Sequence, residues 1–331
     1  MIFKEFIGID VSKLTLDVCI HSTQDSCVFK NSEKGYRLLI KWISKQSKFT
    51  YEESLFIFEH TGLYSHNLSL FFTTSNLHFV ILPGLEIKRS MGLVRGKDDK
   101  IDAKRIALYA FRRRDEIKPS KLPKELIIKM KQLLTLRNQL VKQRASLKTS
   151  LKEMSEILNQ KCNKLLFQIP NRTIKALSKE INLIEYELKL LISTDEELDK
   201  QYKLICSVKG VGEQMALNMI VYTEGFQKFN NARQFAAYCG VAPFPHSSGS
   251  SIRGKERVSH LANKKLKSLI NMCAMSAIQH SPEMKLYYQQ KVLEGKNKMC
   301  IINNIRNKLL HRIFAVINRG TPYVEINKFA A

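Results

Sequence analysis

The sequence predicts an α/β domain followed by two largely helical regions. Over residues 1 to about 115, short apolar runs typical of strands alternate with segments of helical periodicity. Residues 120–200 hold two long segments with apolar residues at three- and four-residue steps, and residues 201–331 are mostly helical in pattern. We therefore predict domains at 1–118, 119–199 and 200–331.

Each element of the first region follows from its local pattern. Strands are predicted where β-branched and aromatic residues run between turn signals, and helices where apolar residues recur on one side. A strand ends at Pro83-Gly84, because proline cannot donate to a sheet ladder. In chain order we expect strands at 6–11, 14–20 and 26–31, a helix at 34–46, a strand at 54–60, a helix at 61–75, a strand at 78–83 and a helix at 100–114.

The remaining elements are helices, turns and one polar loop. Long helices are predicted at 125–158 and 173–193, separated by the "QIPN" segment, and the pair forms either a coiled coil or a plain helical hairpin. A Gly210-x-Gly212 turn joins two further helices. A Ser/Gly-rich loop with basic residues then precedes a helix that begins with lysines.

Composition favours a polyanionic partner. The formal net charge of the 331 residues is +24 and the pI is about 9.7, which in a soluble protein points to nucleic acid. A membrane partner is not expected, because no apolar run reaches about 18 residues. No secretory signal is recognised, and the seven cysteines are scattered without Cys-x-x-Cys spacing. We expect a cytoplasmic protein with reduced thiols.

Four carboxylates stand out as candidate metal ligands. Asp10 lies in an otherwise apolar strand, Glu59 ends another, and Asp99 and Asp102 share a helical face. Clustered carboxylates cannot all stay ionised without cations, and two Mg²⁺ ions about 4 Å apart would neutralise them and clamp a phosphodiester. Three alternatives stay open. In the first, Asp10 is a turn residue. In the second, Glu59 caps a helix that starts near Thr61. In the third, Asp98 takes the place of Asp99.

Two glycine-containing segments suggest phosphate contacts. The loop "PHSSGSSIRGKER" combines serines, glycines and cations, which is typical of a flexible phosphate-contacting element. Gly210 and Gly212 suggest a turn that exposes backbone N–H groups to a phosphate. Our candidate nucleic-acid-binding residues are these two glycines together with Arg95, Lys97, Arg253, Lys255, Arg257, Lys264 and Lys265.

Five motifs in order carry a family resemblance. They are "FIGIDVSK", "FEHTGLY", "GKDDKIDAKRIA", "LICSVKGVGEQMA" and "RQFAAYCGVAPFPHSSGSSIRG". Together they resemble the insertion-sequence transposases with an Asp-Glu-Asp-Asp site, the family of the pilin-gene invertase and the bridge-RNA-guided recombinases. The family pattern Lys-x-Asp-x-x-Asp-Ala matches Lys97, Asp99, Asp102 and Ala103, which favours Asp99 over Asp98.

The resemblance implies a fold and a set of roles. It implies a RuvC-like, ribonuclease H-type first domain, a helical coiled-coil insertion and a family-specific transposase domain. Asp10, Glu59, Asp99 and Asp102 would be catalytic metal ligands for Mg²⁺ or Mn²⁺. Ser248 would be a nucleophile that bonds to DNA, with Ser247 next in preference and Ser250 and Ser251 behind. One departure is Ala262, which stands where the family often has glycine.

The expected activity is cutting, exchanging and rejoining DNA strands of a mobile element. The partners would be donor and target DNA, a structured guide RNA as in part of the family, and further copies of the chain in a dimer, or a tetramer on DNA. Two other functions are weighed against it. One is a two-metal RuvC-like endonuclease that acts on junction DNA without a covalent step, and the other is a non-catalytic nucleic-acid-binding scaffold.

Overall fold

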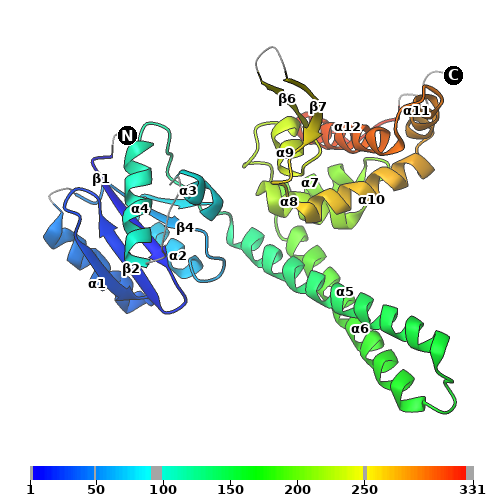
Figure 1. Cartoon of the computed structure of the whole chain (residues 1–331), viewed down its shortest axis with the longest axis horizontal. Coiled ribbons are helices and arrows are strands. Elements are labelled where there is room, and N and C mark those ends of the chain that lie inside the picture. The colour runs from blue at the N-terminus through cyan, green and yellow to red at the C-terminus, as the bar shows by residue number, and fades with distance from the viewer. Residues whose placement is uncertain (1–2, 48–49, 91–98, 249–251, 326–331) are drawn as a thin grey trace. The chain divides into compact units, whose positions relative to one another are not determined.

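The chain forms two compact units, residues 1–122 and 123–331, in a computed structural model (Figure 1). The structure describes residues 3–47, 50–90, 99–248 and 252–325, without the side chains at 90, 99, 100, 246–248, 252, 253 and 255. The first unit is mixed α/β and the second is largely helical. In the described residues, no helix is long and apolar enough to cross a membrane.

A five-stranded mixed sheet forms the centre of the first unit, in the order β3-β2-β1-β4-β5. The pairs β1–β2 and β2–β3 are antiparallel, whereas β1–β4 and β4–β5 are parallel. Strand β1 is almost wholly buried, which explains its nearly continuous apolar sequence. The strands are β1 (Glu5–Val11), β2 (Thr15–Ile20), β3 (Ser26–Lys30), β4 (Ser54–Glu59) and β5 (Phe79–Leu82).

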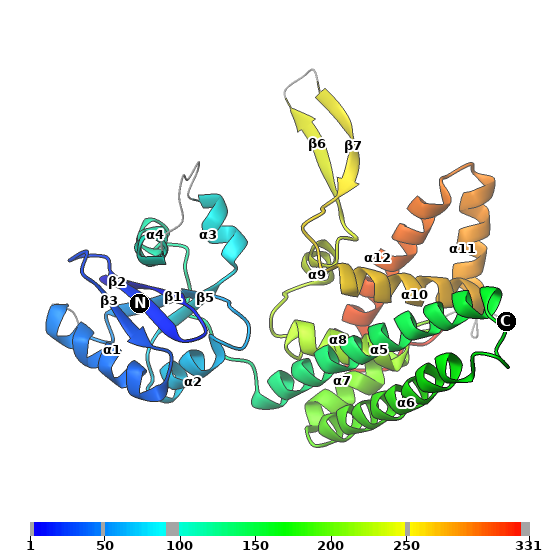
Figure 2. The same cartoon turned by 60° about the horizontal axis from the view of Figure 1, so that its bottom comes forward.

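Helices cover both faces of this sheet (Figure 2). On one face, α1 (Glu33–Gln46) and α2 (His66–Thr74) pack residues such as Leu39 and Phe72 against Ile9 and Phe58. On the other face, α4 (Asp99–Arg112) packs Ile106 and Tyr109 beside residues from β1 and β4. The sheet is therefore the middle layer of three.

Two predictions for the first unit need correction. The helix expected at 61–75 begins only at His66, because residues 61–65 form a loop and Ser65 takes the N-cap position. A short helix that the sequence did not predict, α3 (Gly84–Ser90), follows β5 directly. The third strand, in contrast, is confirmed.

The second unit begins with two long helices, α5 (Glu125–Ile157) and α6 (Lys164–Ser193). The predicted break between them at "QIPN" is wrong, because Pro170 lies inside α6. A proline removes one helical hydrogen bond, but packing overrides that local cost: Phe167 is buried one turn earlier, and its carbonyl accepts a bond from Asn171 Nδ2 at 2.8 Å. The connection therefore lies at 158–163.

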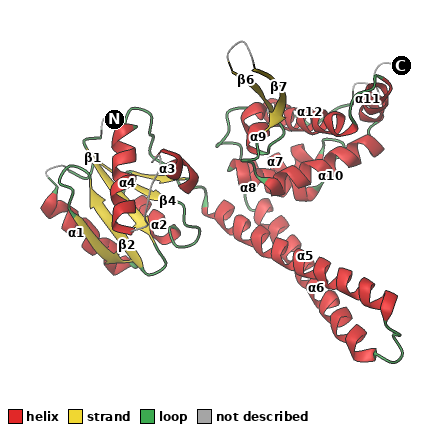
Figure 3. Cartoon of the chain, in the orientation of Figure 1, coloured by secondary structure: helices red, strands yellow, loops and turns green. Residues whose placement is uncertain are grey.

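The remaining helices share one core with the near ends of α5 and α6 (Figure 3). They are α7 (Glu196–Cys206), α8 (Glu213–Thr223), α9 (Ala232–Tyr238), α10 (Lys264–His280), α11 (Pro282–Leu293) and α12 (Lys298–Arg319). The strands β6 (Pro243–Ser248) and β7 (Ile252–Val258) add no described residue to that core. The polar loop predicted from the serines and glycines is instead the antiparallel hairpin β6–β7. The division of this unit between residues 199 and 200 stays a prediction.

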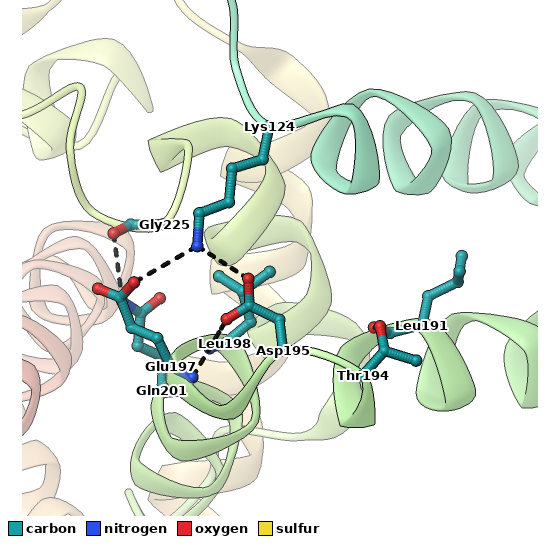
Figure 4. A network of polar contacts seen from close by, with 8 residues as sticks. All are labelled: Lys124, Leu191, Thr194, Asp195, Glu197, Leu198, Gln201 and Gly225. Atoms are coloured by element: carbon teal, nitrogen blue, oxygen red, sulfur yellow. Dashed lines mark hydrogen bonds and ion pairs between the residues drawn. The ribbon is translucent and has the colours of Figure 1, made fainter.

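One polar network fixes the start of the second unit (Figure 4). Asp195 caps α7 by accepting from the backbone N–H groups of Glu197 and Leu198. Lys124 Nζ lies 2.8 Å from the other oxygen of Asp195 and 3.5 Å from a carboxylate oxygen of Glu197. The hydrogen bond from Lys124 lowers the pKa of Asp195. The network ties the beginning of α5 to the beginning of α7.

Candidate active site

Asp10 and Glu59 lie side by side at one edge of the sheet. Strands β1 and β4 run parallel, and Ile9 pairs with Phe58, so the next residue of each strand is the carboxylate. Side chains alternate along a strand, which places Asp10 on the face of Gly8 and Glu59 on the face of Ile57. That is the face covered by α4. Both residues are half-buried.

Helix α4 brings its acidic end to the same edge. A Cβ on Gly8 would lie 2.2 Å from the Ala103 carbonyl oxygen and 2.5 Å from the Ala107 nitrogen, so α4 packs directly on this glycine. At the other end of the helix, Phe111 contacts Phe6, with ring centroids 5.8 Å apart. Helix α4 therefore runs antiparallel to β1, and its N-terminus points toward Asp10.

The acidic pair at the start of α4 follows from this direction. Asp99 is the first residue of the helix and Asp102 precedes Ala103. Asp102 is described with its side chain, and its carboxylate lies 2.9 Å from the Arg105 guanidinium. The Asp99 side chain lies outside the described atoms. Among the described side chains, no three of Asp, Glu, His or Cys converge tightly enough to hold one metal ion.

The alternatives for Asp10 and Glu59 disagree with the geometry. Asp10 lies within the β1–β2 ladder, and the turn that follows is closed by Ser12 and Thr15, whose side chains hydrogen-bond to each other. Glu59 cannot cap α2, because that helix starts seven residues later. Asp98, the alternative to Asp99, lies outside the described residues, whereas Asp99 opens α4.

Sequence reasoning missed two residues at this edge. Asp17 pairs with Asp10 across β1 and β2, and like charges in that position are unfavourable unless something neutralises them. The hairpin symmetry about Ser12 and Thr15 was the signal that could have found it. Gly84 lies against Glu59, since a Cβ there would be 1.7 Å from Glu59 Oε1. In the sequence this glycine indicated only the end of a strand.

The oxygen donors at this edge suit a hard divalent cation in type, because carboxylates are the ligands that Mg²⁺ and Mn²⁺ prefer. The comparisons with known proteins bear on the same region. A transposase model of the DEDD type of IS110 matches residues 7–160, and a model described as the Transposase IS116/IS110/IS902 family matches residues 202–289. Together the two matches cover most of the chain. The chain belongs to the IS110 family of transposases.

Similar proteins agree with this assignment. This chain is 28% identical to the pilin gene-inverting protein of Moraxella bovis, and the alignment covers 97% of this chain and 98% of that protein. The pilin gene-inverting protein of Moraxella lacunata matches to the same extent. The transposase for insertion sequence element IS1111A of Coxiella burnetii is 27% identical over 42% of this chain and 38% of that protein. The chain is thus a DNA recombinase, and its DEDD domain implies a divalent cation.

Two of the candidate serines of the transposase, Ser247 and Ser248, lie in β6. Ser248 ends β6 and pairs with Ile252, and Ser247 pairs with Arg253. Ser250 and Ser251 lie outside the described residues, as do the side chains of the other two serines. The structure therefore brings the predicted nucleophile to the end of an antiparallel hairpin.

The base of the hairpin is closed by small residues. Gly240 has φ +66°, and a Cβ on it would lie 2.5 Å from the Cβ of Ala262. Asn263 donates from its backbone N–H to the Tyr238 carbonyl at 2.9 Å and from Nδ2 to the Tyr238 hydroxyl at 3.2 Å. Ala262, where the family often has glycine, thus contacts a glycine from the opposite side of the hairpin.

The two glycines of the predicted phosphate turn differ in their surroundings. Gly210 has φ +86°, and a Cβ there would lie 2.7 Å from backbone atoms of Ala277, so helix packing alone explains this glycine. Gly212 is the N-cap of α8, and a Cβ there would meet open space. The space on the Cβ side of Gly212 is therefore open, whereas that of Gly210 is filled by α10.

One cluster of cations forms between α5 and α10. Lys265 is half-buried, and its Nζ lies 5.6 Å from the centre of the Tyr222 ring. The positive charges of Arg137 and Lys142 on α5 repel the charged form of Lys265. Burial, with these two like charges, lowers the pKa of Lys265 to about 8. Lys264 and Arg257 are exposed. Arg95 and Lys97 lie outside the described residues, and the side chains of Arg253 and Lys255 are not described.

Proposed function

We propose that the transposase cuts and rejoins DNA with a carboxylate-bound metal centre and a serine nucleophile. The first unit is a ribonuclease H-type, RuvC-like domain in this proposal. Asp10, Glu59, Asp99 and Asp102 would hold divalent cations, Mg²⁺ or Mn²⁺, and Ser248 would bond to DNA. The second unit would supply the serine and further contacts to nucleic acid.

The observation that carries the proposal is the shared edge of β1 and β4. Asp10 near the end of β1 and Glu59 at the end of the parallel strand β4 lie there, and α4 begins at the same edge with its acidic N-terminal turn. Asp102, near the start of that helix, carries a partly exposed carboxylate that lies 2.9 Å from the Arg105 guanidinium. Asp17 adds a fifth carboxylate beside the four that the sequence predicted.

The residues of this chain would act in two ways. A bound divalent cation would polarise the scissile phosphodiester, and the carboxylates would fix its position. The Ser248 hydroxyl would lose its proton as its Oγ bonds to phosphorus, while the bond from phosphorus to one deoxyribose oxygen breaks and that oxygen takes up a proton. The phosphodiester linkage is retained in the adduct, so rejoining needs no external energy source.

Charge and exposed apolar surface support the proposed partners. The +24 net charge suits donor DNA, target DNA and a structured guide RNA. Helix α6 exposes a series of large apolar side chains, which fits pairing of the long helices between copies in a coiled coil. These side chains are Leu165, Leu166, Ile169, Leu183, Tyr186 and Leu190. We expect sedimentation to detect dimers, or tetramers on DNA, and a purely monomeric chain would contradict this part of the proposal.

The metal centre is tested by exchanging one carboxylate for its amide. Asp10→Asn removes a charged ligand at nearly constant shape, so we expect strand cleavage to be lost while the circular dichroism spectrum and melting temperature are kept. The matched control is Asp25→Asn, an exposed aspartate beyond the opposite end of β2. Normal cleavage by Asp10→Asn, with Mg²⁺ or with Mn²⁺, would rule out the proposed centre.

A further inference from the structure

Two neighbouring loops at the carboxylate edge expose three large apolar side chains. Leu14, in the turn after β1, is 73% exposed, and Leu63 and Tyr64, in the loop after β4, are 71% and 48% exposed. Because β1 and β4 are parallel neighbours, both loops leave the sheet at the edge of Asp10 and Glu59. A single exposed leucine is ordinary, but three such side chains on adjoining loops form a patch. We call Leu14, Leu63 and Tyr64 the apolar rim.

One asparagine holds the two loops together. Asn31 Nδ2 donates to the Ser12 carbonyl at 2.8 Å and to the Tyr64 carbonyl at 3.0 Å. Its backbone N–H donates to the Leu14 carbonyl at 2.8 Å, and its Oδ1 accepts from the hydroxyl of buried Tyr36. Bonds from one residue to both loops fix their spacing. The apolar rim is therefore arranged before any ligand binds, which lowers the entropy cost of binding.

Polar groups beside the apolar rim indicate what it receives. Thr61 Oγ1 is buried and has no hydrogen-bond partner among the described atoms, although Thr61 lies only two residues beyond Glu59. Lys13 and His60 are exposed in the same two loops. An exposed apolar surface with an adjacent cation matches a nucleotide, which has an apolar base face and a charged phosphate.

We propose that the apolar rim binds the DNA bases next to the cleaved phosphate. Tyr64 stacks on one base, and Leu14 and Leu63 wedge against the adjacent step, so that the strand bends and its phosphate reaches the carboxylates. This inference rests on the proposed metal centre at the same edge. A second copy of this chain is the less suitable occupant, because the Lys13 cation beside the rim would meet a chain of net charge +24.

The test measures base unstacking with the full chain. The DNA carries the cleavage site, with 2-aminopurine placed in turn at the positions flanking the cleaved phosphate, under conditions in which the wild-type protein cleaves. We expect its fluorescence to rise on binding at one of these positions, because the base leaves its neighbours. Leu63→Ala should remove most of the rise. Leu38→Ala, which truncates a 51% exposed leucine on α1, is the matched control and should keep it.

Activity gives an independent measure of the stacking. Tyr64→Ala should lower kcat/KM for cleavage by about 5- to 150-fold, the range for losing one stacked base. Tyr64→Phe should restore most of that loss, because stacking needs the ring and not the hydroxyl. An equal loss in Tyr64→Phe and Tyr64→Ala would overturn the stacking role. The stacking role would also be overturned if Leu63→Ala and Tyr64→Ala both kept the wild-type fluorescence rise and the wild-type kcat/KM.

Two further measurements separate this inference from the proposed centre. Asp10→Asn should still produce the fluorescence rise while failing to cleave, which would show base binding independent of the metal ligand. If Asp10→Asn cleaves normally, the metal centre is wrong, and the fluorescence of Leu63→Ala still decides the role of the rim. If light scattering finds that Leu63→Ala and Tyr64→Ala reduce self-association without changing fluorescence, the rim is a contact between copies and the inference fails.

Discussion

The carboxylate of Glu59 occupies the space that a side chain at residue 84 would fill. A Cβ on Gly84 would lie 1.7 Å from Glu59 Oε1 and 2.3 Å from its carboxyl carbon. Gly84 opens α3, directly after β5, and β5 is the parallel neighbour of β4. Because residue 84 is a glycine, the carboxylate of Glu59, a candidate metal ligand, can lie between the ends of β4 and β5.

Gly84→Ala should impair cleavage more than it impairs folding. The added methyl group meets the far end of a flexible side chain, so Glu59 can move aside at small cost to the fold, but its carboxylate is then displaced from the edge of the sheet. We expect a loss of strand cleavage with little change in melting temperature. Wild-type cleavage by Gly84→Ala would show that the position of Glu59 does not matter for the reaction.

Gly8→Ala, in contrast, should impair folding more than it impairs cleavage. The new Cβ would meet backbone atoms of Ala103 and Ala107, which cannot move without lifting α4 from the sheet. We expect the free energy of unfolding of the first unit to fall by about 1–3 kcal/mol, as for other overpacked cores. Calorimetry on the full chain measures this loss, with Asp25→Ala, an exposed position in the turn between β2 and β3, as the control. An unchanged unfolding transition would contradict the close packing of α4 on β1.

Much of the first unit could be predicted from local patterns. The alternation of apolar strands with periodic helices is strong there, so Asp10 could be assigned to one strand and Glu59 to the end of another before any geometry was known. What could not be predicted depends on pairing. Asp17 lies opposite Asp10 only through the β1–β2 register, and Gly84 matters only through its closeness to Glu59.

The errors in the second unit have similar causes. Proline disfavours helix interiors, so the sequence predicts a helix boundary at Pro170, but the burial of Phe167 keeps that turn helical. The β6–β7 hairpin lacks the apolar alternation of a half-buried sheet, since Phe244 and Arg257 at its base are both exposed. Its serines and glycines therefore indicated only a loop.

The pH dependence of nucleic-acid binding should report on Lys265. The pKa of this lysine is lowered to about 8, and only its charged form attracts a phosphate. We expect affinity for DNA to fall as pH rises through about 8. In Lys265→Met this part of the pH dependence should vanish, and the slope of log affinity against log salt should flatten by about one unit. Lys285→Met, an exposed lysine on α11, is the control.

Protein stability should change with pH in the opposite sense. The folded state of Lys265 binds its proton less tightly than the unfolded chain, because its pKa is lowered from 10.5. The unfolded chain therefore binds more protons between about pH 8 and 10.5, and this lysine makes stability rise with pH in that window. Lys265→Met should remove that rise. If binding and stability keep their wild-type pH dependence in Lys265→Met, the lysine is not the group that titrates.

The last prediction concerns the serine at the end of β6. If Ser248 is the nucleophile, protein should migrate with DNA after denaturation when the reaction is trapped on a nicked substrate. The adduct should disappear in Ser248→Ala and persist in Ser247→Ala, whose position pairs with Arg253 one step back along the hairpin. A hairpin delivers its end residue without disturbing the core, because its base is held by Gly240, Ala262 and Asn263. An adduct that survives in Ser248→Ala would place the nucleophile elsewhere. Cleavage by the wild-type chain without any adduct would indicate direct hydrolysis.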